Sequence, residues 1–337
     1  MSTVGNPRLR LASAGALPTG RIAVFGADAA TALPDLPPGA SLHMIAPFRP
    51  DHDAFAARGL ATSAEPEGRY DAAFVILPRA RDAGRARVAE AMALVRPGGP
   101  VWVDGAKTDG IDSMLRDLRA HLPVGETLAK AHGKIARLSA GPGLPEGWAA
   151  TDLHPAPGFV TRPGVFSAET VDRGSALLAA ALPPKLPARV ADLGAGWGWL
   201  SVQVLARGGV AALDLIEADA LALDCARRNI ADPRAVFHWA DATRFAPEAR
   251  YGAVVMNPPF HQGRAADPAL GLSFIAAAAR LLSLSGTLFM VANRHLPYEQ
   301  ALAAAFREVE EIAGDSAFKV IRAGKPDSRP RTAARRH

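Results

Sequence analysis

The second half of the chain alternates short, mostly apolar runs typical of strands with longer stretches in which apolar residues recur at helical spacing. This alternation is typical of a parallel sheet whose strands are connected by helices. The predicted strands are residues 189–193, 211–216, 235–239, 251–256 and 286–292, and the predicted helices are residues 200–207, 219–230, 268–282 and 298–309. Together they predict a doubly wound α/β domain.

The first half repeats this order more faintly. Its predicted strands are residues 21–25, 41–46, 71–77 and 100–104, and its predicted helices are residues 81–95 and 111–121. Residues 21–27 can be laid over residues 189–195, and residues 70–78 over residues 251–259. An internal duplication explains this overlay and predicts two tandem Rossmann-like sheets. The alternative is that any two parallel α/β domains resemble each other to this degree.

The first copy lacks residues that the second copy offers to a ligand. The overlay replaces three of them: Gly196 by Asp28, Gly198 by Ala30 and Asn257 by Ile76. We therefore expect a degenerate domain over residues 1–150 and a ligand-binding domain over residues 151–324. The Gly- and Pro-rich segment at residues 141–162 is the predicted linker.

Composition excludes several classes of protein. Of the 337 residues 49% are hydrophobic, which is enough for packed cores and excludes wholesale disorder. The single cysteine, Cys225, excludes a disulfide framework and a cysteine-rich zinc site, and we expect no bound metal. The chain has no uncharged apolar run of about 18 residues and no apolar signal-peptide core, so we expect a cytoplasmic protein without a membrane span.

The net charge of +5 is concentrated at the C-terminus. Residues 325–337 contain five basic residues and one aspartate, so this basic tail alone supplies +4. The remainder of the chain is close to neutral, and charge by itself does not indicate a nucleic-acid partner. The tail is either a source of phosphate contacts or a solvated chain end.

A glycine-rich loop follows the predicted strand at residues 189–193. Asp192 in that strand is followed by Gly194, Gly196 and Gly198, which let the backbone turn sharply and a ligand lie against the main chain. A dinucleotide fingerprint would require glycine where Trp199 stands, which disfavours a nicotinamide dehydrogenase. The G-x-G-x-G spacing instead resembles motif I of class I S-adenosylmethionine-dependent methyltransferases, which implies that Asp192 lies near the methionine end of that cofactor. The alternative is a plain strand-to-helix turn.

Two further acidic residues follow the next predicted strands. Glu217 ends the second strand, where a carboxylate can accept both ribose hydroxyls of a nucleoside. Asp241 follows the third strand, where it can accept from an adenine amine. Each alone is an ordinary loop carboxylate, but their placement after successive strands favours the cofactor site.

The loop after the fourth strand carries Asn257, Pro258, Pro259 and Phe260. Two prolines end the strand and fix the loop backbone, which presents Asn257 rigidly. The Asn257 oxygen and the Pro258 carbonyl can accept the two hydrogens of an exocyclic amine, and Phe260 can stack on the ring that carries it. This is the Asn-Pro-Pro-aromatic signature of amino-group methyltransferases, and it predicts in-line methyl transfer without a strong general base.

Several longer segments resemble one family of enzymes. They are Pro-Gly-Val-Phe-Ser at 163–167, Asp-Arg-Gly-Ser at 172–175, Asn-Pro-Pro-Phe-His-Gln-Gly at 257–263, Val-Ala-Asn-Arg-His-Leu-Pro-Tyr at 291–298 and Phe-Lys-Val at 318–320. In the first half the likeness rests on residues 104–111 and 131–134. These segments resemble the ribosomal RNA small subunit methyltransferase C family, with the large-subunit guanine-N2 methyltransferase G as a close relative.

The resemblance implies N2-methylation of a guanine in ribosomal RNA, with S-adenosyl-L-methionine as cofactor. It implies that Asp172 and Gly174 flank the cofactor together with the residues already named. It also implies that the first copy is a degenerate methyltransferase-like domain that helps recognise RNA. We therefore expect ribosomal RNA or a ribosomal subunit, with the small subunit favoured, as the partner of a monomeric enzyme.

Two alternatives remain at this point. An Asn-Pro-Pro-aromatic loop also serves methyltransferases that act on protein glutamine or DNA adenine. A non-catalytic RNA-binding or ribosome-assembly factor that retains the fold is the alternative from another class.

Overall fold

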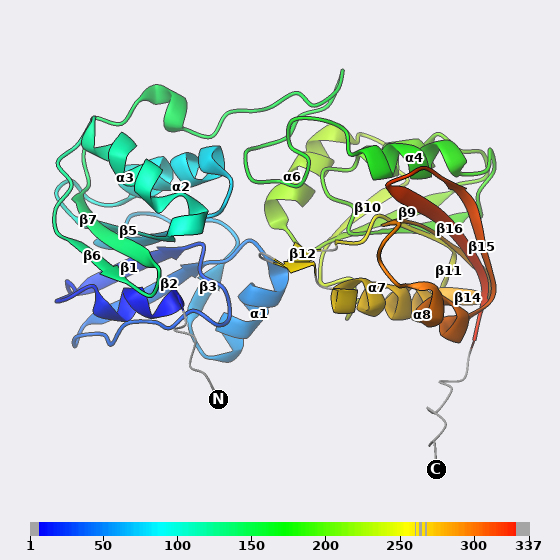
Figure 1. The fold of residues 1–337 in the computed structure, drawn as a ribbon, viewed down its shortest axis with the longest axis horizontal. Coiled ribbons are helices and arrows are strands. Elements are labelled where there is room, and N and C mark those ends of the chain that lie inside the picture. Colours follow the sequence, from blue (N-terminus) through cyan, green and yellow to red (C-terminus); the bar gives the residue numbers. More distant parts are fainter. Residues whose placement is uncertain (1–6, 260, 263–264, 267, 328–337) are drawn as a thin grey trace, which may run out of the picture. The chain divides into compact units, whose positions relative to one another are not determined.

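The computed structural model of the protein describes residues 7–259, 261–262, 265–266 and 268–327 (Figure 1). The chain divides into two compact units. One comprises Met1–Leu153 with Arg162–Gly164, and the other comprises His154–Thr161 with Val165–His337. Among the described helices, none has the length and apolar character needed to cross a membrane.

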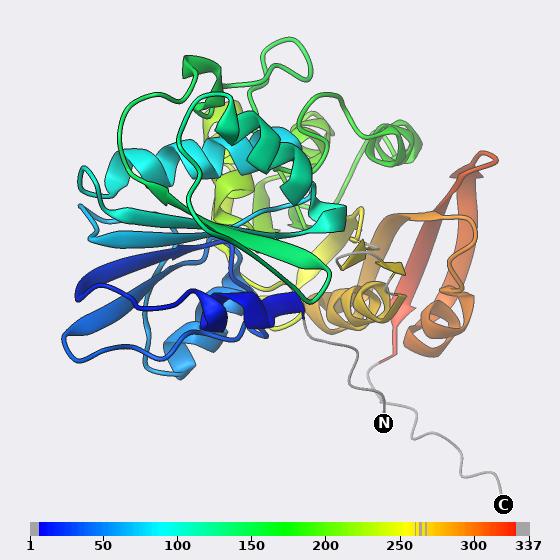
Figure 2. The ribbon, with the colours of Figure 1, turned by 60° about the vertical axis from the view of Figure 1, so that its left-hand side comes forward.

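The N-terminal unit is built on a seven-stranded sheet in the order β3-β2-β1-β4-β5-β7-β6. Its elements are η1 Pro7–Ser13, β1 Gly20–Phe25, β2 Ala40–Ile45, α1 Arg49–Ala57, β3 Ala61–Ser63, β4 Ala72–Ile76, α2 Arg81–Leu94, β5 Pro100–Ala106, η2 Lys107–Asp109, α3 Ile111–Arg119, β6 Thr127–Lys130, β7 Gly133–Ser139 and η3 Glu146–Trp148. Ala23 and Phe25 of β1 pack with residues of α2 and α3, whereas Ile22 and Val24 pack with residues of η1 and α1. Helices therefore cover both faces of this sheet (Figure 2).

The C-terminal unit has a second seven-stranded sheet, in the order β10-β9-β8-β11-β14-β16-β15. Its elements are α4 Arg173–Ala181, β8 Arg189–Leu193, α5 Trp199–Leu205, β9 Ala212–Glu217, α6 Ala220–Asn229, β10 Ala235–Trp239, β11 Tyr251–Met256, β12 His261–Gln262, β13 Ala265–Ala266, α7 Pro268–Leu281, β14 Leu282–Asn293, α8 Glu299–Ala305, β15 Phe306–Gly314 and β16 Phe318–Pro326. Alternate residues of β11 again face opposite layers: Val255 packs with α4, α5 and α6, and Val254 packs with α7 and α8.

The two sheets share one topology. In each, the first five strands in chain order pair in parallel, and the last two strands are added antiparallel at one edge. The position of β1 in the first sheet is that of β8 in the second, and β4 corresponds to β11. This correspondence confirms the tandem α/β architecture and places β1 and β8, which contain most of the two overlaid segments, at equivalent positions.

One predicted element was wrong over part of its length. The helix predicted at residues 298–309 ends at Ala305, and Phe306–Gly314 forms the edge strand β15. Its partner β16 was not predicted as a strand. It extends through Pro326, so that Lys325 and Pro326, which were predicted to begin the basic tail, continue this strand. Residues 328–337 of that tail lie outside the described part of the chain.

Candidate active site

The glycine-rich loop connects β8 to α5 through three residues with left-handed backbone. Gly194, Gly196 and Gly198 have φ angles of +74°, +56° and +87°. A methyl group added at Gly198 would lie 2.8 Å from Cδ1 of Ile230, so this glycine allows close packing inside the unit. A methyl group at Gly196 would meet nothing within 4 Å. Gly196 therefore leaves space for a ligand against the main chain.

Glu217 holds this loop in place from the end of β9. Its Oε2 accepts a hydrogen bond of 2.8 Å from the backbone N–H of Gly196, and its Oε1 accepts one of 2.8 Å from Asp219. Burial raises the pKa of Glu217 to about 7, although these N–H donors act in the opposite direction. A carboxylate with a pKa near neutrality, and with no cation found beside it in the described part of the chain, is suited to a ligand that brings its own hydrogen-bond donors.

Asp192 lies beneath the loop and is only 1% exposed. Its Oδ2 accepts a hydrogen bond of 2.7 Å from the Ser201 hydroxyl, whereas its buried Oδ1 has no partner among the described residues. Burial, and to a smaller extent the charge of Glu217, raises the pKa of Asp192 to about 7. Native proteins rarely leave a buried carboxylate oxygen unsatisfied, so this atom indicates a missing donor.

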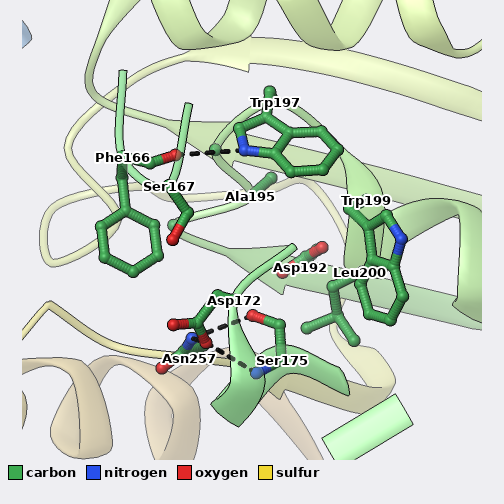
Figure 3. A pocket seen from close by; sticks show the side chains of 12 residues that line it. Phe166, Ser167, Asp172, Ser175, Asp192, Ala195, Trp197, Trp199, Leu200 and Asn257 are labelled. Atoms are coloured by element: carbon green, nitrogen blue, oxygen red, sulfur yellow. Dashed lines mark hydrogen bonds between the residues drawn. The ribbon is translucent and has the colours of Figure 1, made fainter. Parts of the chain in front are cut away.

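Asn257 is bound to the first turn of α4 (Figure 3). Its Nδ2 donates to Oδ2 of Asp172 at 2.8 Å and to Oγ of Ser175 at 2.9 Å. Asp172 is also the N-cap of α4, because the same Oδ2 accepts from the backbone N–H of Ser175 at 2.8 Å. Both amide hydrogens of Asn257 thus have partners, and its Oδ1 is left as an acceptor.

These groups line one pocket. It has an empty volume of about 440 Å³, and its lining residues are Phe166, Ser167, Asp172, Ser175, Asp192, Gly194, Ala195, Gly196, Trp197, Trp199, Leu200 and Asn257. Five predicted site residues are therefore brought together here: Asp172, Asp192, Gly194, Gly196 and Asn257. Glu217 contributes through its bond to Gly196.

Of the other predicted residues, those that the structure describes do not line this pocket. Gly174 lies in the first turn of α4, where a methyl group would come within 3.0 Å of Asp172 Oδ2. Asp241 accepts from the backbone N–H and the hydroxyl of Thr243 at 2.8 and 2.6 Å. Pro258 is buried and Pro259 exposed. Phe260 lies outside the described residues.

Sequence reasoning missed two of the polar groups that complete the site. Ser175 binds Asn257, and its position three residues after an N-cap aspartate was the available signal. Ser201 binds Asp192 across the glycine loop, and no local pattern predicts that contact. Phe166 was also not predicted as a site residue, although it is 58% exposed beside the pocket and its carbonyl accepts from Trp197 Nε1 at 3.1 Å.

The residues of this site fit S-adenosylmethionine. The unsatisfied Oδ1 of Asp192 and the carboxylate of Glu217 can accept hydrogen bonds from ammonium and hydroxyl groups. Gly196, whose N–H binds Glu217, leaves open space for the ligand against the main chain. A doubly wound sheet with a glycine loop after its first strand and an Asn-Pro-Pro loop after its fourth defines the molecule as a methyltransferase of class I.

Comparison with known proteins gives the family. A family model described as methyltransferase small domain matches residues 157–322. The ribosomal RNA small subunit methyltransferase C of Pseudomonas paraeruginosa is 30% identical over 284 residues, which is 81% of this chain and 84% of that protein. The protein of the same name from Cronobacter sakazakii is 29% identical and covers 79% of each chain. The chain belongs to the ribosomal RNA small subunit methyltransferase C family.

A solved structure agrees with this assignment over both units. It is that of a T. thermophilus 16S rRNA N2 G1207 methyltransferase in complex with AdoMet and guanosine. The two structures match with a TM-score of 0.77 and 25% sequence identity, over 95% of this chain and 92% of that chain. The likeness therefore extends beyond the catalytic half to the degenerate copy.

Proposed function

We propose that this protein transfers a methyl group from S-adenosylmethionine to the exocyclic N2 amine of a guanine in 16S ribosomal RNA. The observation that carries the proposal is the fixed orientation of Asn257. Because both amide hydrogens of Asn257 are bound by Asp172 and Ser175, the atom it presents to a substrate is an acceptor. An acceptor suits an amine that has hydrogens to donate.

Family membership and the T. thermophilus structure support the choice of substrate and cofactor. Bound S-adenosylmethionine would supply an electrophilic methyl group on a sulfonium sulfur. Glu217 would accept hydrogen bonds from ribose hydroxyls, and Asp192 would pair with a donor of the methionine part through its unsatisfied Oδ1. Asp241 is the proposed partner of the adenine amine.

The protein's task at the amine is to position it and to adjust its geometry. The lone pair of an aromatic amine is delocalised into the ring, which makes the nitrogen a poor nucleophile. Hydrogen bonds from the amine to Asn257 Oδ1 and to the Pro258 carbonyl favour the pyramidal form, in which the lone pair is available. When the nitrogen gains the methyl group, the bond between that methyl carbon and the sulfonium sulfur would break and leave a neutral thioether. The nitrogen would release one proton to water, because alkylation makes that proton acidic. Phe260 remains the proposed stacking partner of the base.

The test is methyl transfer from radiolabelled cofactor to naked 16S rRNA and to assembled small subunits, with the product nucleoside identified by mass spectrometry. We expect N2-methylguanine from one of these substrates with the wild-type protein. We expect at least a hundredfold loss of rate with Asn257→Ala and retained cofactor binding. Transfer to a protein glutamine, or to neither RNA substrate, would contradict the proposal. Since ribosomal RNA is the proposed substrate, we expect the protein in the cytoplasm.

A further inference from the structure

The N-terminal unit contains a pocket of its own, distinct from the position of a degenerate cofactor site. It has an empty volume of about 700 Å³ and is lined by Lys107, Asp112, Ala129, Lys130, Ala131, His132, Gly133 and Lys134. The residues that replace the glycines and asparagine of the catalytic copy, Asp28, Ala30 and Ile76, do not line it. The pocket lies instead where β5 ends and the β6–β7 hairpin turns.

The lysines of the first half of the chain are concentrated at this pocket. The chain has six lysines among its 38 basic residues, and the only lysines in residues 1–150 are Lys107, Lys130 and Lys134. All three line this pocket, where Asp112 is the only acidic residue and pairs with Lys134 at 2.7 Å. Lys107 and Lys130 are exposed. The three lysines and one aspartate of the lining thus give an excess of two positive charges.

The hairpin turn at this pocket has an unusual backbone. Ala131 and His132 form the two-residue connection between paired residues Lys130 and Gly133, and their φ angles are +46° and +55°. Such turns favour Asn-Gly because left-handed backbone disfavours residues with a Cβ. Here the second position holds an exposed histidine instead of glycine. A strained residue that the surrounding structure maintains indicates a functional constraint.

A buried ion pair maintains this conformation. Arg10, only 3% exposed, donates from Nε and Nη2 to the Asp104 carboxylate at 2.6 and 3.0 Å. Its Nη1 donates to the carbonyl oxygen of Ala131 at 3.1 Å and to that of Lys130 at 3.5 Å. A methyl group at Gly133 would lie 2.4 Å from the Gly105 carbonyl oxygen, so the hairpin packs closely on β5. The turn is fixed before any ligand binds.

We propose that this pocket binds a phosphodiester group of the RNA substrate. Lys107 and Lys130 provide compact positive charges, Lys134 is held in place by Asp112, and the His132 imidazole provides an N–H donor at the tip of the turn. The proposal rests on the proposed function, because it takes RNA as the ligand. It assigns a role to residues 104–111 and 131–134, the two segments of the first half that carried the family resemblance and that the methyl-transfer site does not use.

The test compares three variants with the wild-type protein: Lys107→Ala with Lys130→Ala, His132→Gly, and Lys185→Ala as a matched control, because Lys185 is an exposed lysine of the other unit. The affinity for a 16S rRNA fragment is measured by filter binding over a range of KCl concentrations. We expect the double variant to bind about tenfold more weakly, with the slope of log K against log[KCl] reduced by about 1 to 2. Its affinity for S-adenosylmethionine should equal that of the wild-type protein.

The His132→Gly variant separates a binding role from a structural one. Glycine adopts a φ of +55° without strain, so we expect a higher melting temperature together with weaker RNA binding. Unchanged RNA affinity and salt slope in the double variant, while wild-type protein methylates 16S rRNA, would overturn the pocket proposal alone. Absence of methylation by wild-type protein would overturn the proposed function. If the double variant loses binding of inorganic phosphate but keeps the wild-type affinity for RNA, the pocket binds a free anion, and the proposal is also overturned.

Discussion

Binding of S-adenosylmethionine should weaken as the pH falls through neutrality. The raised pKa values of Glu217 and Asp192, both about 7, mean that each carboxyl is largely protonated at pH 5.5. The hydroxyl and ammonium donors of the cofactor favour the ionised carboxylates, so binding requires the loss of protons that the free protein holds. Affinity therefore rises with pH and becomes constant once both groups are ionised in the free protein.

The magnitude follows from the pKa. If only ionised Glu217 binds the ribose, a pKa of about 7 makes the apparent Kd at pH 5.5 about 30 times that at pH 8.5, or about 2 kcal/mol. Asp192 adds to this dependence, so that log Kd falls with rising pH at low pH with a slope between −1 and −2. At pH 7 the binding of cofactor should release about half a proton from each carboxyl.

The assay is isothermal titration calorimetry from pH 5.5 to 8.5, with two buffers of different ionisation enthalpy at pH 7 to count the protons released. Glu217→Gln should bind more weakly at pH 8.5 and show a shallower pH dependence. Glu248→Gln, a change at an exposed glutamate, should keep the wild-type slope. The reasoning is refuted if the wild-type Kd changes less than threefold across this range, or if folded Glu217→Gln keeps the full slope.

The remaining predictions concern single contacts of the site. Ser175→Ala removes one of two acceptors that orient Asn257, so the turnover rate should fall about fivefold while cofactor affinity changes little, as measured by single-turnover kinetics and calorimetry. Gly196→Ala should weaken cofactor binding at least tenfold, because the new methyl group enters open space at the pocket, and should cost about 1 kcal/mol of stability through its left-handed backbone. Gly198→Ala should lower the free energy of unfolding by about 2 to 4 kcal/mol in urea titrations, because its methyl group also meets Ile230. Equal effects of the two glycine changes on stability would contradict the separation between them.

The central strands were predictable because each is buried on both faces. β11 appears in the sequence as an unbroken run without charged residues, and β8 has Asp192 as its only polar residue after Arg189, which set the bounds of both predicted strands. The edge strand β15 was not predictable in the same way. Five successive residues after Phe306 are exposed, and several are charged, so the segment shows no alternation of apolar and polar positions. Its strand conformation comes from pairing with β16, which is a tertiary contact.

The site shows the same division. Asp192 lies near the end of β8, and Gly196 and Asn257 follow β8 and β11, which are neighbouring parallel strands, so their proximity could be expected from topology. The hydrogen bonds of Ser175 and Ser201 depend on where α4 and α5 lie against that edge. The hydrogen bond from Arg10 to the carbonyl of the β6–β7 turn joins residues more than a hundred positions apart, so no local sequence pattern indicates it.

A single oxygen, Oδ2 of Asp172, caps the N-terminus of helix α4 and also accepts a hydrogen bond from the amide of Asn257. Fraying of the first helical turn should therefore also release Asn257, the proposed ligand of the target base. The rate of hydrogen exchange at the Ser175 amide would then report the fraction of molecules in which Asn257 is not held in position. A substitution that slows this exchange should increase the competent fraction of enzyme even though it touches neither cofactor nor RNA.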